Sequence, residues 1–320
     1  MIIQVENVRK EFKSKITSNF WRDLFYPVFK KVNAVDGISF SIEKGESVAL
    51  LGPNGAGKTT TMKMLSGLIY PSSGSLKALG FTPSERKREY LMRIGLVMGN
   101  KSGLDWDLTP AQSFQLIKKI YKIKDHEYKS RLDELVEMLD VAGFLDIQVR
   151  KLSLGERMKM ELIGAILHSP EVLFLDEPTI GLDILSKKRI REFLREVQSK
   201  YAVTLVLTSH DMDDVEKVCD RVIVINKGRK VYDDSLKSLV DDYEKVRYVR
   251  FIFDTNPDEK MLSGMGKVVE KSEDFYVFEV DPTKTVELIS KVSSKFDVID
   301  LSIQSVPLEE IIEQIFRQKR

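Results

Sequence analysis

Cysteine is almost absent from this 320-residue chain, and the other shortages of the sequence are equally informative. The single cysteine, Cys219, excludes an intrachain disulfide framework and a cysteine-based zinc site. Basic and acidic residues number 50 and 49, and this balance gives no indication of a nucleic-acid partner. No run approaches the roughly 18 consecutive apolar residues of a membrane span. The first residues also lack the apolar region of a signal peptide, so we expect a cytoplasmic protein.

The composition is that of a folded protein, because 42% of the residues are hydrophobic and 31% are charged. Apolar runs of strand length alternate with helical patterns, which predicts an α/β fold with a doubly wound, largely parallel sheet. A helical block at about 100–160 is inserted into this pattern. The pattern changes near residue 240, so we expect one domain at 1–240 and a small α+β domain at 241–320. The order expected within 246–320 is strand, strand, helix, strand, helix. The strand-length runs are 2–8, 34–42, 47–51, 172–175, 203–207 and 221–225.

A glycine-rich loop provides the first chemical motif. It matches the pattern G-x-x-x-x-G-K-[ST] and lies between an apolar strand and a predicted helix. Glycines at these positions let successive backbone N–H groups converge on phosphate oxygens at a helix N-terminus. The lysine would reach the β- and γ-phosphates of a nucleotide, and the threonine hydroxyl after it would ligate Mg²⁺. The expected nucleotide-binding residues are Gly52, Pro53, Asn54, Gly55, Ala56, Gly57, Lys58, Thr59 and Thr60.

Two further polar groups follow apolar strands. Asp176 and Glu177 end the run Val172–Leu175, and His210 comes shortly after the run 203–207. Asp176 is expected to bind Mg²⁺ through a water, and Glu177 to act as a general base toward an attacking water. Because the carboxyl ends of parallel strands meet in one crevice, we expect these groups and the glycine-rich loop around one γ-phosphate.

These motifs, in this order, resemble those of the ATP-binding cassette (ABC) ATPases, a family of P-loop NTPases. The resemblance covers roughly residues 1–235 and includes a loop similar to the family signature, formed by Leu152, Ser153, Leu154, Gly155 and Glu156. It implies an antiparallel β region at the N-terminus, binding of ATP and Mg²⁺, and a head-to-tail homodimer or pseudo-dimer. In that dimer, Ser153 and Gly155 of one subunit contact ATP on the other. The resemblance also places Asp183 in a loop at the dimer contact.

The sequence departs from the family pattern at several positions. Leu154 and Glu156 replace the usual glycine and glutamine of the signature. Asn100 stands where the family has a glutamine that touches Mg²⁺ and the attacking water, and we assign it the same role. Phe12 lies where the family often has an aromatic residue that stacks on adenine. A core phenylalanine at the end of the first strand is the alternative.

Within the family, the sequence is most similar to the ATPase subunits of prokaryotic drug, antibiotic or sodium exporters that are encoded separately from their permeases. This resemblance implies an integral-membrane permease as partner and a peripheral position on the cytoplasmic face of the membrane. Two alternatives remain open. One is a cassette ATPase that acts outside transport, on ribosomes or DNA, and the other is a nucleotide-gated regulatory module with little hydrolysis.

A basic and aromatic segment at 13–31 is longer than a minimal cassette needs. Its apolar residues recur at helical spacing, although Pro27 interrupts the pattern. Such a segment suits a membrane interface or a groove on a partner, and we hypothesise that it docks on the bilayer or on a membrane-embedded protein. An elaborated hairpin that packs on its own domain is the alternative.

Deletion of residues 14–31 is expected to weaken recruitment to membranes while ATP affinity stays near normal, because the glycine-rich loop is untouched. Co-sedimentation with membranes and a nucleotide-binding titration measure the two quantities. Unchanged recruitment would contradict the docking hypothesis.

Overall fold

The computed structural model describes residues 1–16, 28–99, 102–243, 246–254, 262, 264–272 and 274–318. The chain forms two compact units, Met1–Leu236 and Lys237–Arg320. Among the described residues, no helix combines the length and the apolar character that crossing a bilayer requires.

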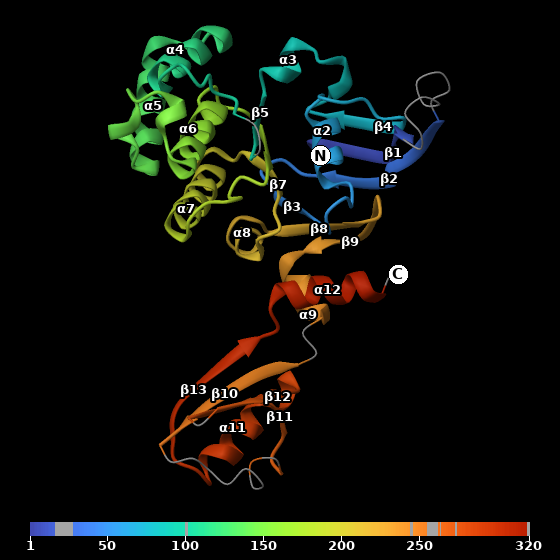
Figure 1. Cartoon of the computed structure of the whole chain (residues 1–320), viewed down its shortest axis with the longest axis vertical. Helices are drawn as coiled ribbons and strands as arrows, with labels where there is room; N and C mark the ends of the chain where they lie inside the picture. The colour runs from blue at the N-terminus through green and yellow to red at the C-terminus, as the bar shows by residue number, and fades with distance from the viewer. Residues whose placement is uncertain are drawn as a thin grey trace. The chain divides into compact units, whose positions relative to one another are not determined.

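The first unit contains an antiparallel sheet, a central sheet and a block of helices (Figure 1). Its strands are β1 (Ile3–Ile16), β2 (Val28–Ile42), β3 (Ser47–Leu51), β4 (Ser73–Ala78), β5 (Ile94–Met98), β6 (Val172–Asp176), β7 (Thr204–Thr208), β8 (Arg221–Asn226) and β9 (Arg229–Ser235). Its α-helices are α2 (Lys58–Leu65), α3 (Arg88–Leu91), α4 (Pro110–Tyr121), α5 (Asp125–Leu139), α6 (Leu154–Ile166), α7 (Ile184–Tyr201) and α8 (Met212–Val218).

The central sheet has the strand order β5-β6-β7-β3-β8-β9, and all its pairs are parallel except β8 with β9. Every residue of β3, β6 and β7 is buried, as expected for parallel strands covered on both faces. The register sets Asp176 beside Thr208 and Thr208 beside Leu50. The predicted P-loop α/β fold is therefore confirmed, and the chain segments after β3, β6 and β7 leave the sheet at the same edge.

The N-terminal region is an antiparallel sheet of order β2-β1-β4, as the family resemblance implies. Its strands β1 and β2 extend well beyond the predicted runs 2–8 and 34–42, because the hairpin continues to the pair Ile16 and Val28. The extension is rich in charged residues, and its few apolar residues do not alternate regularly with polar ones, so it lacks the pattern by which strands are predicted. The centre of the basic aromatic segment, 17–27, lies outside the described residues. The described ends of that segment are paired strands, which favours the hairpin alternative there.

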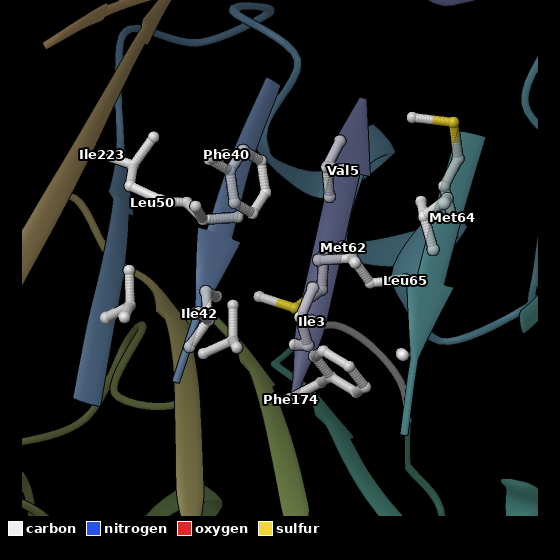
Figure 2. Close-up of a cluster of buried hydrophobic side chains, with 14 of the residues drawn as sticks. Ile3, Val5, Phe40, Ile42, Leu50, Met62, Met64, Leu65, Phe174 and Ile223 are labelled. Atoms are coloured by element: carbon white, nitrogen blue, oxygen red, sulfur yellow. The ribbon is translucent and has the colours of Figure 1, made fainter. Parts of the chain in front are cut away.

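The main hydrophobic core of this unit lies between the two sheets and around α2 (Figure 2). Side chains from β1 and β2 meet the buried face of α2 and the central strands. Leu50, Met62 and Phe174 are among its largest fully buried members. The core therefore joins the antiparallel sheet to the helix that follows the glycine-rich loop.

Helices α4, α5 and α6 form a helical block on one side of the central sheet, away from β1, β2 and β4 (Figure 1). A capping box begins α4, where Thr109 and Gln112 bond to each other's backbone N–H. His168 follows α6, stacks on Tyr121 of α4 and contacts the Ile94 carbonyl oxygen at 2.9 Å through Nε2. Its other ring nitrogen, Nδ1, is buried and has no hydrogen-bond partner among the described residues. Burial lowers the pKa of His168 to about 4.

The second unit is an antiparallel sheet of order β11-β12-β10-β13 with helices. A separate apolar core joins the sheet to α11. One strand more than predicted precedes α11, because β11 is a short, mostly exposed edge strand with three charged residues. The elements from the end of the first unit onward are α9 (Leu236–Tyr243), β10 (Arg247–Phe253), β11 (Lys267–Lys271), β12 (Phe275–Val280), α11 (Thr285–Ser293), β13 (Val298–Ser305) and α12 (Leu308–Gln318).

We expect His168 to make the first unit sensitive to acid. Its folded pKa of about 4 lies below the ordinary value of 6.5, so protonation favours the unfolded chain as the pH falls. As the pH falls from 6.5 to about 4, the contribution of His168 should lower the free energy of unfolding by up to about 3 kcal/mol. Urea unfolding of the parent and of His168→Phe, at pH 7 and near pH 5, measures the difference.

His126 provides the control, because it is an exposed histidine of the same helical block. His126→Phe should keep the acid sensitivity of the parent, whereas His168→Phe should reduce it. An equal pH dependence in the parent and in His168→Phe would exclude His168 as the cause.

Candidate active site

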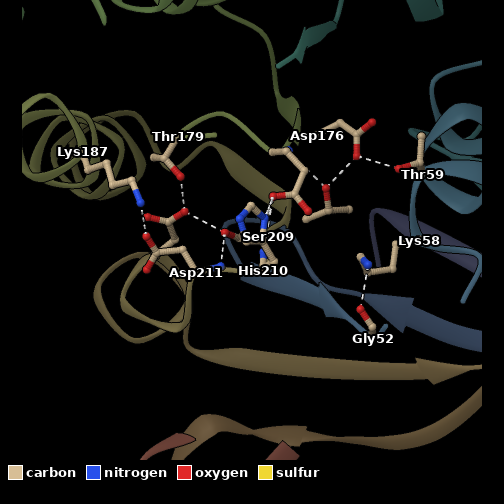
Figure 3. Close-up of polar contacts among 12 residues, drawn as sticks. Gly52, Lys58, Thr59, Asp176, Thr179, Lys187, Ser209, His210 and Asp211 are labelled. Carbon is tan, nitrogen blue, oxygen red and sulfur yellow. Dashed lines mark hydrogen bonds and ion pairs between the residues drawn. The ribbon is translucent and has the colours of Figure 1, made fainter. Parts of the chain in front are cut away.

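The glycine-rich loop wraps around the N-terminus of α2. Gly57 has φ 112°, and a Cβ there would lie 2.5 Å from the Ala34 carbonyl oxygen, so only glycine fits. The Lys58 ammonium folds back and donates to the Gly52 carbonyl oxygen at 2.7 Å (Figure 3). It also donates to the Pro53 carbonyl oxygen at 3.3 Å. Burial lowers the pKa of Lys58, and the carboxylates of Glu177 and Asp176 partly offset this effect. The loop thus holds a buried cation among converging backbone groups.

Two oxygen ligands suited to Mg²⁺ lie side by side at the start of α2 and the end of β6. The Thr59 hydroxyl donates to Asp176 Oδ1 at 3.0 Å, and the Thr208 hydroxyl donates to the same atom at 2.6 Å (Figure 3). The described residues hold no cluster of three or more carboxylate, histidine or cysteine side chains that could enclose a metal ion. A hydroxyl and one carboxylate are suitable ligands for Mg²⁺, whose coordination is usually completed by substrate phosphates and water.

Glu177 and His210 form a second pair next to the first. His210 Nδ1 lies 2.7 Å from Glu177 Oε2, and the His210 backbone N–H also donates to that oxygen at 3.3 Å. Glu177 adopts a left-handed backbone conformation with φ 55°, which is unusual for a residue with a side chain. Its N–H donates to the Thr208 carbonyl oxygen at 3.0 Å, so the turn is held by the neighbouring strand. The side chain of Glu177 is 19% exposed and that of His210 is 61% exposed.

A cleft of about 770 Å³ joins most of the predicted site residues. Phe12 lines it and is 42% exposed, so the alternative of a core phenylalanine is wrong. Asn100 lies outside the described residues. The cleft is lined by Phe12, Val32, Asn33, Ala34, Asn54, Gly55, Ala56, Gly57, Lys58, Thr59, Thr60, Glu177, Ile180 and His210.

The signature residues lie elsewhere in the unit, and the described residues that line the cleft do not include them. Ser153 is the N-cap of α6, and it forms a capping box with Glu156. A Cβ at Gly155 would lie 2.6 Å from the Ser186 hydroxyl oxygen, so the helix start packs closely on the start of α7. Asp183 caps α7 by accepting from the Ser186 N–H at 2.9 Å. The signature residues therefore start a helix at a place apart from the glycine-rich loop.

Several residues of the site belong to none of the predicted motifs. Thr208 bonds to Asp176, and Asp214 connects three elements although it is only 1% exposed. Asp214 accepts from Ser209 Oγ at 2.7 Å, from Arg191 Nε at 2.6 Å and from the Thr179 hydroxyl. The sequence offers one indication of this role, because Asp214 is an acidic residue in the first turn of the helix that follows His210. Asp214 holds the segments that follow Glu177 and precede His210 against each other.

Comparisons with known proteins agree with this geometry. Residues 35–180 match the family model described as ABC transporter. The chain is 36% identical over 224 residues to the ABC transporter ATP-binding protein NatA of Bacillus subtilis, covering 70% of this chain and 90% of NatA. It is also 36% identical over 207 residues to the Nod factor export ATP-binding protein I of Burkholderia thailandensis, covering 65% of this chain and 67% of that protein.

Solved structures show the same fold. An ATP-binding subunit of an ABC transporter has a TM-score of 0.62 at 24% identity, covering 76% of this chain and 93% of its own. A dimeric ATP-binding cassette with ADP and Pi has a TM-score of 0.61 at 21% identity, covering 73% of this chain and 98% of its own. With the glycine-rich loop, the paired carboxylates and the signature helix in place, the chain belongs to the ATP-binding subunits of ABC transporters, which are ATPases.

Proposed function

We propose that this chain binds Mg-ATP in the cleft and hydrolyses it by in-line attack of water on the γ-phosphate. The observation that carries the proposal is that Lys58, Thr59 and the Glu177–His210 pair line one cleft. Asp176 is not among the lining residues, but it is bonded to Thr59 directly behind them. Glu177 accepts a proton from the attacking water, and His210 holds the γ-phosphate. Mg²⁺ bound with the nucleotide supplies charge neutralisation at the phosphates. In this arrangement, catalysis comes mainly from positioning of the reacting groups and from electrostatic stabilisation of the charge on the phosphates.

The Glu177–His210 contact has a consequence for this mechanism. A carboxylate 2.7 Å from an imidazole nitrogen fixes the orientation of both side chains. His210 is the more exposed partner, and Glu177 is the more buried one and directly follows Asp176 in the sequence. The general base is thus oriented by a neighbour that itself contacts substrate, which is the arrangement that a positioned water requires.

We further propose that two copies, or this chain and a similar subunit, pair head to tail around two nucleotides. The signature residues of this chain lie outside its own cleft, on the N-terminus of α6. A helix N-terminus carries free N–H groups and a positive dipole end, both favourable for phosphate. Ser153 and Gly155 of one subunit would therefore complete the phosphate site of the other, with Asp183 at the contact between subunits.

The dimer is proposed to drive a separate membrane permease from the cytoplasmic face of the membrane, and export is the proposed direction. Support for export comes from the relative named for Nod factor export and from the similarity to separately encoded exporter ATPases. The helical block α4–α6 is the proposed transmission surface, because β5 and α6 connect it directly to the site. The chemical nature of the cargo depends on the permease.

Glu177→Gln is expected to keep ATP binding and reduce turnover by about a hundredfold or more, because an amide cannot accept the proton of water. The variant should also accumulate as a dimer with ATP bound. Phosphate release measures the first effect, and gel filtration with ATP measures the second.

Glu171→Gln is the matched control, because Glu171 immediately precedes the same strand, β6, at its opposite end. It should hydrolyse ATP at nearly the parent rate. Parent-like turnover in Glu177→Gln would remove Glu177 from the role of general base.

Lys58→Ala is expected to weaken ATP binding itself by about tenfold or more, since a charge-assisted contact to phosphate is lost. Titration calorimetry with ATP measures the affinity. Lys63→Ala, in the last turn of the same helix, serves as the control and should bind ATP normally. Normal affinity in Lys58→Ala would overturn the assignment of the phosphate loop.

A further inference from the structure

We propose that Asp214 is a positioning residue for hydrolysis, because its carboxylate sets the distance between Glu177 and His210. The proposal rests on the ATPase function proposed above, and it gives a role in turnover to a residue outside the predicted motifs. Asp214 is not among the described residues that line the nucleotide cleft, so it acts through the two that do. Its contacts with two hydroxyl groups are called the Asp214 bridge below.

The Asp214 bridge joins the two chain segments that carry the reacting pair. The Thr179 hydroxyl and the Ser209 hydroxyl both donate to Asp214 Oδ2, the second of them at 2.7 Å (Figure 3). Thr179 follows Glu177 by two residues, and Ser209 directly precedes His210. One carboxylate oxygen therefore holds a point next to the first residue of the pair and a point next to the second.

The Asp214 bridge is almost completely shielded from water. Asp214 and Ser209 are each 1% exposed, and Thr179 is 3% exposed. A hydroxyl buried in this way has lost water as a partner, so leaving it without an acceptor is unfavourable. A hydrogen bond to a charged acceptor is also stronger than one between neutral groups. Thr179 and Ser209 are therefore held firmly against the same atom.

Arg191 of α7 orients the carboxylate for the bridge. Its Nε donates to Asp214 Oδ1 at 2.6 Å, which leaves Oδ2 for the two hydroxyls. The Arg191 guanidinium also pairs with Asp211 Oδ2 at 3.0 Å. Asp211 caps α8, and its N–H donates to Ser209 Oγ at 3.0 Å. The buried carboxylate thus has a counter-charge, and its orientation is fixed relative to α7 and to the segment before α8.

The contact between Glu177 and His210 depends on the relative position of two turns. The side chain of His210 is 61% exposed, so packing alone does not hold its ring next to Glu177. The N–H of Glu177 is held by the Thr208 carbonyl oxygen, and the turn after Glu177 is held by the bridge at Thr179. A displacement of about 1 Å at a reacting group can lower a rate by about a hundredfold. The bridge therefore influences turnover by keeping the pair at 2.7 Å.

A second aspartate makes similar contacts away from the cleft and provides a matched control. Asp220 Oδ2 accepts from the Ser47 hydroxyl at 2.6 Å, and Asp220 Oδ1 pairs with Arg195 at 2.8 Å. Ser47 is fully buried and begins β3, at the end of the strand opposite to the glycine-rich loop. Arg195 lies one turn after Arg191 on α7. Ser47→Ala therefore removes the same kind of contact and measures its effect on stability alone.

Thr179→Val is the most conservative test of the bridge, because it removes the hydroxyl and keeps the branched shape of the side chain. It leaves the ion pair of Asp214 with Arg191 intact, and the domain is expected to stay folded. The kcat for ATP hydrolysis should fall by about threefold to tenfold, since one of the two contacts to the carboxylate is lost. Thr179→Ser keeps the hydroxyl and should hydrolyse ATP at nearly the parent rate.

Asp214→Ala removes the whole bridge and should lower kcat by about tenfold or more. ADP lacks the γ-phosphate that His210 is proposed to hold, so the Kd for ADP should stay within about twofold of the parent value. Calorimetric titration measures this affinity and also shows that the glycine-rich loop remains folded. Asp214→Asn should retain more activity than Asp214→Ala, because its amide can still bond to both hydroxyls.

The ring signals of His210 in an NMR spectrum measure the contact with Glu177 without turnover. The chain has only three histidines, His126, His168 and His210, so each ring can be assigned by substitution. Glu177→Gln defines where the His210 signals lie when the neighbouring carboxylate is lost.

The variants of the bridge should move the His210 signals toward the position that Glu177→Gln defines. This shift is expected for Asp214→Ala and, to a smaller extent, for Thr179→Val. The signals of the other two histidines should stay where they are in the parent. Ser47→Ala should lower the melting temperature but keep the parent kcat and all three sets of ring signals.

A double variant distinguishes positioning from a general loss of stability. In the Glu177→Gln background, Asp214→Ala should change the remaining turnover by less than about twofold, because the carboxylate that it positions is absent. A substitution that merely loosens the domain would lower the remaining turnover as well.

The proposal is overturned if Thr179→Val and Asp214→Ala keep the kcat and the His210 signals of the parent, or if Ser47→Ala changes both as much as they do. A further tenfold loss from Asp214→Ala in the Glu177→Gln background would also overturn it. Failure of the proposed function has a different signature. In that case the parent fails to hydrolyse ATP or Glu177→Gln turns over normally, while the His210 signals still show whether Asp214 sets the contact.

Discussion

The carboxylate of Asp176 receives hydrogen bonds from two threonine hydroxyls that are far apart in the sequence, and the active site depends on this junction. Thr59 starts the helix after the glycine-rich loop, and Thr208 ends the strand next to Asp176. A buried carboxylate is stable only when such partners are present. The contact is possible because β6 and β7 are parallel and pair Asp176 with Thr208. The register of two buried strands therefore sets the position of Asp176 relative to Thr208 and to the start of α2.

The backbone around this junction is unusually constrained. Glu177 is held in a left-handed conformation by bonds to Thr208, and Gly99 lies so close to the Glu177 carbonyl that no side chain would fit. Residues held in rare conformations persist only where the surroundings determine them from several sides. Asp214 adds a further constraint through Thr179 and Ser209. Glu177 is thus placed by main-chain geometry as much as by the contacts of its side chain.

The helical block is also held in place by local contacts, most of which involve α6. The capping box of Ser153 and Glu156 starts α6, and the substitution of glutamate for the usual glutamine of the signature leaves that box intact. The same helix packs on the start of α7 through Gly155 and accepts the loop after β5 through Glu161 and Gly164. One helix thereby contacts two segments that are distant in the sequence, the start of α7 and the loop after β5.

Features that depend on residues close together in the chain could be predicted from the sequence. The glycine-rich loop, the pair Asp176 and Glu177, and His210 each follow an apolar strand, so local patterns were sufficient to predict a P-loop fold and one phosphate site. The polar ends of the β1–β2 hairpin, the edge strand β11 and the partners of Asp214 became evident only in the folded structure. The same is true of the contact of Glu161 with Ser102, which are 59 residues apart. These features arise from pairing between distant segments, and the hydrogen bonds involved leave no periodic pattern in the sequence.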